Sequence, residues 1–186
     1  MADRRQVITS ARRLFAEKGY FSTGTTEIVE VARVGTRGAL YAHFPNKKAL
    51  FLEVLEELET ELGEKVGLTL TGGTWRERLE QALAAFLDAS LDADVRRILL
   101  IDGAVLGWDA WREIEARHGL GAIKLMLDKG NTEGCLRVAD TETMSHLLLS
   151  VIDEAALLIA HASKPRKARA AVGKSLAALV TGLAAP

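Results

Sequence analysis

Apolar residues recur at helical spacing along this whole chain, and the alternation of β-branched and aromatic residues that is typical of strands is nearly absent. In the first segment, Val7, Ile8, Ala11, Leu14 and Phe15 fall on one face of a helix. The chain has 186 residues, of which 48% are hydrophobic, so it is long enough to bury a core. We therefore expect an all-α protein.

Capping and turn-forming residues place three helices before residue 46. We expect them over about residues 3–18, 25–33 and 36–44, because Ser, Thr and Asp favour helix starts and Gly favours helix ends. Val34 and Gly35 form a tight connection between the second and third helices. The residues expected to begin or end these helices are Ala2 or Asp3, Gly19, Thr25 or Thr26, and Thr36.

A long helix is expected to follow, with Asn46 as its cap and no linker interrupting it. Its apolar residues are Leu50, Phe51, Val54, Leu55, Leu58 and Leu62. We place the domain boundary at its start, which divides the chain into residues 1–46 and residues 47–186. A rigid helix between the two parts would carry movement from one to the other.

The C-terminal part is also expected to be helical. Gly72 and Gly73 form a loop, and Thr74 and Glu77 have the spacing of a capping box at a helix start. Further helices are expected over about residues 94–106, 109–129, 141–161 and 165–183. Their separators are Gly107, Gly130 and residues 163–165.

Basic residues gather at the N-terminal end of a chain whose net charge is only −1. Residues 1–48 hold nine Lys and Arg against four Asp and Glu. A basic segment on an acidic body indicates that this end meets a polyanion, although an imbalance of this size also arises by chance.

We expect a cytoplasmic protein without a membrane segment. The single cysteine, Cys135, cannot form an intrachain disulfide, which is typical of a reducing compartment. The N-terminus lacks the apolar run of a signal peptide, and Asp153 and Glu154 interrupt the most apolar stretch, residues 147–162.

Two short helices joined by a tight turn form a helix-turn-helix, whose second helix enters the major groove of DNA. Arg37 can donate two hydrogen bonds to guanine, and Gly38 and Ala39 are small enough to let the helix approach DNA closely. Tyr41 and His43 are expected to reach flanking phosphates. The alternatives are a phosphate contact for Arg37 and packing roles for Tyr41 and His43.

Helix starts add further phosphate contacts, because their backbone N–H groups and dipole favour an anion. Lys47 begins the long helix, and Thr25 and Thr26 begin the helix before the turn. The candidate DNA-binding residues are therefore Thr25, Thr26, Thr36, Arg37, Gly38, Ala39, Tyr41, His43 and Lys47.

These residues resemble the tetracycline-repressor (TetR) family. The likeness is carried by Thr25-Thr26, by the run Thr36-Arg37-Gly38-Ala39-Leu40-Tyr41-x-His43-Phe44, and by Lys47 and Leu50. It covers about residues 4–55, and the number and length of the helices agree over the rest.

The resemblance implies a three-helix DNA-binding head on a helical body that binds a small ligand and pairs with a second copy through its last two helices. Most members are repressors that a ligand releases from DNA. In the family, the positions that match Thr25, Thr26, Arg37, Tyr41, His43 and Lys47 contact DNA.

The helix before the turn allows two registers. If the family spacing from Thr25 to Tyr41 is kept, Val29 takes the usual apolar site. Glu30, Arg33 and Gly35 then fall where small or aliphatic residues are usual. Alternatively, those sites are taken by Ile28, Ala32 and Val34, and the turn carries one extra residue.

Aromatic residues of the body either line a ligand pocket or belong to the core, and the candidates are Trp75, Phe86, Trp108 and Trp111. The histidines are too widely spaced to predict a metal site, and we expect no cofactor. No catalytic constellation indicates an enzyme.

The last two expected helices are apolar over most of their surface, so each must be covered on more than one side. A fully intramolecular core would do this, but a homodimer is favoured because two heads supply the two half-sites of an operator. We expect a transcriptional regulator of double-stranded DNA, a repressor that a small apolar effector releases from a near-palindromic operator. A helical enzyme and a protein-interaction module that does not bind DNA are the alternatives.

Overall fold

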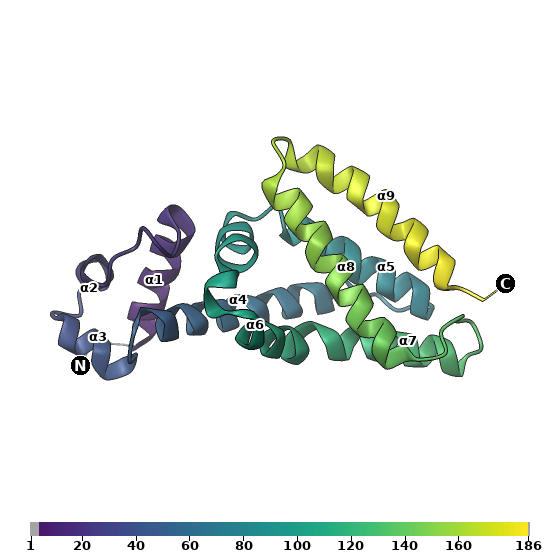
Figure 1. Cartoon of the computed structure of the whole chain (residues 1–186), viewed down its shortest axis with the longest axis horizontal. Coiled ribbons are helices and arrows are strands. Elements are labelled where there is room, and N and C mark those ends of the chain that lie inside the picture. Colours follow the sequence, from purple (N-terminus) through teal and green to yellow (C-terminus); the bar gives the residue numbers. More distant parts are fainter. Residues whose placement is uncertain (1–3, 186) are drawn as a thin grey trace. The chain divides into compact units, whose positions relative to one another are not determined.

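The computed structural model describes residues 4–185, except for the side chains of Trp108 and Glu115, and these residues are helical along most of their length (Figure 1). A single backbone bridge joins Leu136 to Ala184, and the described part of the chain holds no longer strand. The all-α prediction is confirmed. The elements in chain order are α1 (Arg4–Lys18), α2 (Thr25–Ala32), α3 (Arg37–His43), α4 (Lys47–Thr69), α5 (Trp75–Ala89), η1 (Val95–Ile101), η2 (Gly103–Leu106), α6 (Trp108–Glu115), η3 (Ala116–Leu120), α7 (Gly121–Thr132), α8 (Thr141–His161) and α9 (Pro165–Leu183).

Several helix boundaries follow the expected capping residues. The Asn46 side chain accepts a hydrogen bond from the Ala49 N–H at 2.8 Å, at the start of α4. Thr74 and Glu77 form both hydrogen bonds of the capping box before α5. Gly19 ends α1 with a φ of 82°. The bounds of α8 and α9 are those expected.

Other boundaries were predicted wrongly. Gly24, and not Thr25 or Thr26, is the N-cap of α2. Gly130 lies inside α7 and does not end it; the Trp75 indole lies so close that a Cβ there would be 2.7 Å from it, so the glycine serves packing. The chain between 95 and 106 forms a π-helical turn (η1) and a 3₁₀ turn (η2) in place of one regular helix. The expected caps Ala2 and Asp3 lie outside the described residues.

The backbone divides into two compact units, each built from two stretches of chain. The first unit contains residues 1–59 and 93–111, and the second contains residues 60–92 and 112–186. The helix α4 runs without interruption from the first unit into the second.

The core of the first unit is formed by the predicted faces of its helices. All five apolar residues expected on α1 are buried, and so is the expected face of α4. The Phe15 ring meets the Phe51 ring edge-on at 5.1 Å, and Tyr20 meets Phe51 at 5.0 Å. This aromatic cluster fastens α1 and the loop after it to α4.

Residues 93–111 join the first unit through a buried carboxylate. Asp102 is 6% exposed and accepts hydrogen bonds from the Tyr20 N–H at 2.8 Å and from Arg97 Nε at 3.2 Å. Arg97 Nη2 also donates to the Lys18 carbonyl oxygen at 3.3 Å. The guanidinium lies so close to Gly19 that a Cβ there would be 1.8 Å from Nη2.

The second unit packs α5, α7, α8 and α9 together. α8 lies beside α9 and also contacts α7 and α5 (Figure 1). One core cluster of the second unit consists of these buried residues: Trp75, Leu79, Leu83, Ile123, Met126, Leu127, Leu136, Val138, Leu148, Leu149, Ile152 and Val180.

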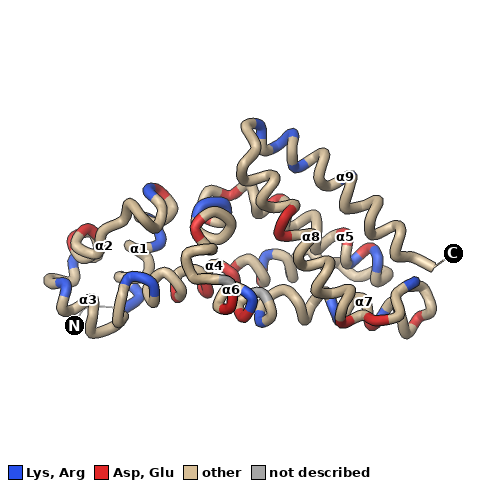
Figure 2. Tube along the Cα trace, viewed as in Figure 1, with Lys and Arg blue, Asp and Glu red and all other residues tan. Residues whose placement is uncertain are grey.

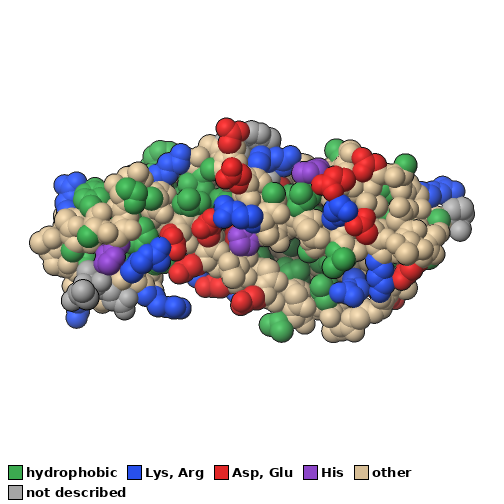
Figure 3. Space-filling view, turned by 90° about the horizontal axis from the view of Figure 1, so that it is seen from below, with side chains coloured by type: hydrophobic (Ala, Val, Ile, Leu, Met, Phe, Trp, Pro, Cys, Tyr) green, Lys and Arg blue, Asp and Glu red, His purple; other side chains and the backbone are tan. Residues whose placement is uncertain are grey.

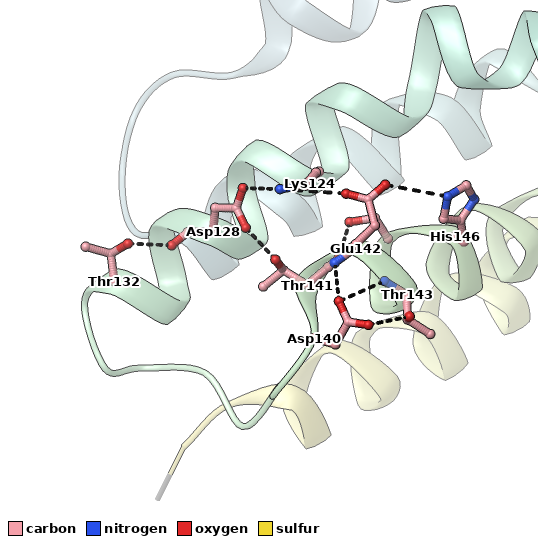
Figure 4. A network of polar contacts seen from close by, with 9 residues as sticks. Lys124, Asp128, Thr132, Asp140, Thr141, Glu142, Thr143 and His146 are labelled. Carbon is pink, nitrogen blue, oxygen red and sulfur yellow. Dashed lines mark hydrogen bonds and ion pairs between the residues drawn. The ribbon is translucent and has the colours of Figure 1, made fainter.

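A polar network joins one side of α7 to the start of α8 (Figure 4). Asp128 accepts from Lys124 at 2.7 Å and from the Thr141 hydroxyl at 2.5 Å. These two hydrogen bonds lower the pKa of Asp128. Asp140 caps α8 by accepting from the backbone N–H groups of Glu142 and Thr143. This side of α7 is therefore linked to the start of α8.

α8 is long and apolar enough to cross a membrane, by length and composition alone. The expectation that Asp153 and Glu154 exclude this is wrong by that measure. In its most apolar window, 39% of the residues are buried inside the structure. The core helix of a folded bundle has the same composition, so this is weak evidence for a membrane span.

The buried carboxylate of Asp102 yields a stability prediction. Asp102→Ala leaves the Tyr20 N–H and the Arg97 guanidinium without their acceptor, so we expect a loss of about 1–3 kcal/mol of unfolding free energy, measured by urea denaturation. Asp109→Ala, at an exposed position of the same segment, is the control and should change stability little. Equal unfolding midpoints for the two variants would contradict the role given to Asp102.

Candidate nucleic-acid interface

The connection between α2 and α3 selects one of the two registers left open by the sequence. Ile28, Ala32 and Val34 are buried, and so is Val29, whereas Glu30, Arg33 and Gly35, which the other register puts at small or aliphatic sites, are exposed. Arg33 ends α2 in the left-handed region with φ 53°, and Gly35 follows with φ 83°. The turn therefore carries the extra residue, and these two left-handed positions accommodate it.

One side of α3 is buried in the core and the other side is exposed to solvent. The Thr36 hydroxyl accepts from the Ala39 N–H at 3.2 Å and caps the helix. Leu40 and Phe44 point into the core, with exposed fractions of 0% and 3%. The exposed side of the helix holds Thr36, Arg37, Gly38, Tyr41 and Ala42, with Ala39 half-buried.

Three of the predicted DNA-binding side chains meet on this surface. The Arg37 guanidinium lies 5.8 Å from the centre of the Tyr41 ring. Hydrogen bonds from Arg37 and then Thr25 lower the pKa of the Tyr41 hydroxyl. The contact with Thr25 links α2 to α3. The arrangement presents a cation and two hydroxyls on one exposed patch.

The first turn of α2 offers backbone donors next to this patch. Gly24 has no side chain, so none accepts from the first N–H groups of the helix. Thr25 is half-buried and Thr26 is exposed. Uncapped N–H groups at a helix start are suited to a phosphate oxygen.

Lys47 lies in the same region but has partners within the protein. Its ammonium donates to the carbonyl oxygens of Tyr20 at 2.9 Å and Thr23 at 3.1 Å. It also lies 4.2 Å from the centre of the Tyr20 ring. An ammonium has three N–H donors, so one is left for a phosphate while two hold the loop between α1 and α2. The phosphate contact of Lys47 stays a prediction.

Sequence reasoning missed two positions of this surface. Ala42 is exposed on α3, four residues after Gly38 and therefore on the same face of the helix. Lys48 is exposed in the first turn of α4. Helical spacing from Gly38 would have found Ala42, whereas the exposure of Lys48 in place of Lys47 depends on the fold.

Basic positions mark this end of the chain. Figure 2 shows them along α1, around α3 and at the start of α4. In the space-filling view, Lys, Arg and His side chains are visible at the end formed by α1–α3 (Figure 3). His43 is exposed at the C-terminal end of α3, 6.4 Å from the Phe44 ring. A polyanion would meet complementary charge here.

The four aromatic residues proposed for a ligand pocket lie in different parts of the chain, and their role in a pocket stays a prediction. Trp75 and Phe86 belong to the core of the second unit, near opposite ends of α5. Trp75 lines a hollow on that unit, whereas Phe86 lines neither hollow described for it. Trp111 belongs to the first unit and packs against Gly103, and the Trp108 side chain lies outside the described residues. Among the described residues, no three His, Cys, Asp or Glu side chains are grouped so as to hold a metal.

Two family profiles match this chain. The profile described as "Bacterial regulatory proteins, tetR family" matches residues 7–54, which include α2, α3 and the candidate interface. The profile described as "Tetracyclin repressor-like, C-terminal domain" matches residues 76–183. Together they cover most of the helices of both units.

Individual proteins agree with the profiles. The chain is 30% identical to the Transposon Tn10 TetC protein of Escherichia coli over 147 residues, which cover 76% of this chain and 72% of that protein. It is 44% identical over 61 residues to the HTH-type transcriptional regulator AcrR of Shigella flexneri, covering 33% of this chain and 28% of that protein. The crystal structure of a TetR-family transcriptional regulator from Pectobacterium atrosepticum has a TM-score of 0.85 and 27% identity, covering 98% of this chain and 94% of that chain.

Gly38 allows the interface to be tested without disturbing the fold. A Cβ at Gly38 would meet only Thr36 Oγ1, at 3.6 Å, so Gly38→Ala fits the free protein. It should raise helix stability by about 0.5–1 kcal/mol, because Ala favours a helix over Gly. If α3 lies against DNA, the added methyl group should weaken specific DNA binding, measured by fluorescence anisotropy.

Gly63→Ala makes the same change inside α4, where a Cβ would meet nothing within 4 Å. This control should gain similar stability and keep full DNA affinity. Undiminished binding by both variants would argue against a close approach of α3 to DNA at Gly38.

Proposed function

This chain belongs to the tetracycline-repressor (TetR) family of transcriptional regulators, and from that premise we propose that it is a homodimeric, cytoplasmic repressor that a small ligand releases from a near-palindromic operator. The observation that carries the DNA-binding part is the exposed patch of Thr25, Arg37 and Tyr41 on α2 and α3. The curated relatives AcrR and QacR are named as HTH-type transcriptional regulators, so we propose no enzymatic activity.

In the proposed complex, α3 lies in the major groove and Arg37 donates to the edge of a guanine. Gly38, Ala39 and Ala42 let the helix backbone approach the bases, and Thr36 holds the first turn of that helix in place. Phosphates on either side are bound by the hydroxyls of Thr25, Thr26 and Tyr41, by the ring of His43, and by the ammonium groups of Lys47 and Lys48.

Dimerisation is proposed to use the outer faces of α8 and α9. Leu147, Val151 and Leu158 are 56%, 37% and 54% exposed, and their spacing of four and seven residues puts them on one side of α8. Leu179 on α9 is 52% exposed. A second copy that covers this apolar surface would remove it from water and bring two heads to two half-sites.

Ligand release is proposed to act through α4, which runs unbroken from the head into the second unit. A ligand that binds one spacing of the two heads more tightly than the other shifts the population toward that spacing. Its differential affinity for the two states sets the size of the effect on DNA binding.

The DNA-binding proposal is tested first by selection from random duplexes, followed by anisotropy titration of the selected operator against a scrambled duplex. We expect selective binding whose affinity falls about a thousandfold or more between about 50 and 200 mM salt, because phosphate contacts release counterions. Arg37→Ala should cost about 1–3 kcal/mol on the operator and much less on scrambled DNA. Failure to enrich any sequence would contradict the proposal.

The dimer proposal is tested by Leu158→Glu, which puts a charge into the apolar face of α8. We expect this variant to sediment as a monomer where the unaltered protein sediments as a dimer, and to lose tight operator binding. Leu68→Glu is the matched control, since Leu68 is 85% exposed on α4. A dimeric Leu158→Glu protein would place the interface elsewhere.

A further inference from the structure

The second unit carries a hollow of about 280 Å³ between the start of α5 and one face of α7. All of its lining belongs to that unit. The lining residues are Leu70, Trp75, Arg78, Ala122, Leu125, Met126 and Lys129. Five are apolar and two are cationic, and no acidic residue is among them.

Helical spacing explains why α7 presents this face. Ala122, Leu125, Met126 and Lys129 follow one another at intervals of three, one and three residues, which puts them on one side of the helix. The other side carries Lys124 and Asp128, which are bound to each other and to α8 (Figure 4). The polar contacts of Lys124 and Asp128 are thus made away from the hollow.

Arg78 lines the hollow, and one of its side-chain N–H donors is unsatisfied. Its Nε is fully buried and has no hydrogen-bond acceptor. The nearby Arg76, on the same helix, has two hydrogen-bond acceptors. Its Nε donates to Glu80 and its Nη2 donates to Thr181, both at 2.8 Å. A buried donor without an acceptor costs free energy, and no hydrogen bond of Nε holds this guanidinium to the protein.

Lys129 adds a second positive charge at the rim. Its nearest carboxylate is that of Glu133, and the Nζ–Oε1 distance of 3.9 Å is too long for a hydrogen bond. Trp75, which is 3% exposed, and Met126, which is 7% exposed, belong to the apolar part of the lining. The hollow is therefore lined by both apolar and cationic side chains.

We propose that this hollow binds a small amphipathic carboxylate, with its carboxylate on Arg78 and Lys129 and its apolar part on Trp75 and Met126. A guanidinium holds a carboxylate through paired, charge-assisted hydrogen bonds. At about 30 Å³ per water-sized group, the volume holds about ten non-hydrogen atoms. The ligand is therefore a short aliphatic or single-ring acid.

The inference rests on the proposed function only in naming this carboxylate as the effector that acts on DNA binding. Binding of the carboxylate itself is measured without DNA. The probe is octanoate, with 1-octanol as its uncharged counterpart, titrated by isothermal calorimetry into the full chain. We expect octanoate to bind with a Kd of about 1 mM or tighter, and octanol to bind at least about tenfold more weakly.

Arg78→Met should weaken octanoate binding about tenfold or more and leave octanol binding unchanged. It should not lower the melting temperature, since Nε makes no hydrogen bond that the substitution removes. Lys129→Met is the second variant and should weaken octanoate binding by a smaller factor. Arg76→Met is the matched control, which loses two internal hydrogen bonds and should melt earlier while keeping octanoate affinity.

Equal binding of octanoate and octanol, or octanoate affinity unchanged in both Arg78→Met and Lys129→Met, would overturn the proposed site. Operator binding with and without octanoate is then measured separately. If octanoate binds as expected but the protein selects no operator, the site stands and the proposed function fails. If the operator is bound but octanoate is not, the reverse holds.

Discussion

The carboxylate of Asp102 holds together two stretches of chain that lie about eighty residues apart, and the candidate DNA-binding surface depends on it. It binds the backbone N–H of Tyr20, whose carbonyl oxygen accepts from Lys47 and whose ring packs on Phe51. The loop between α1 and α2 is thereby fixed from both sides. Because α2 begins at the end of that loop, the position of Thr25 beside Tyr41 follows from these contacts.

The fold could be predicted where a helix is specified by its own residues. The apolar face of α4 and the bounds of α8 and α9 were readable because periodicity and caps are local. Boundaries that depend on the rest of the fold were not readable. Gly130 does not end α7 but makes room for the Trp75 indole, and that contact joins residues more than fifty positions apart.

The candidate interface was predictable to a similar degree and for the same reason. At α3 the expected residues Thr36, Arg37, Gly38 and Tyr41 are exposed. Their exposure was predictable because the spacing of apolar residues within one short helix shows which side faces the core. The carbonyl partners of Lys47 come from a loop more than twenty residues earlier, so its pattern in the sequence did not reveal them. The unsatisfied Nε of Arg78 was equally hidden, since only the folded bundle shows which arginines find acceptors.

The first unit is built from two stretches of chain, and this limits how its head can be joined to the body of another protein. A DNA-binding head transferred at residue 46 or 59 would leave behind Asp94 and Asp102, which bind Arg12 and Tyr20 on the head. The recipient would have to provide acceptors at the same places or accept a loosened α1. In a hybrid regulator, residues 93–111 therefore have to be transferred together with the head, although they lie within the body in the sequence.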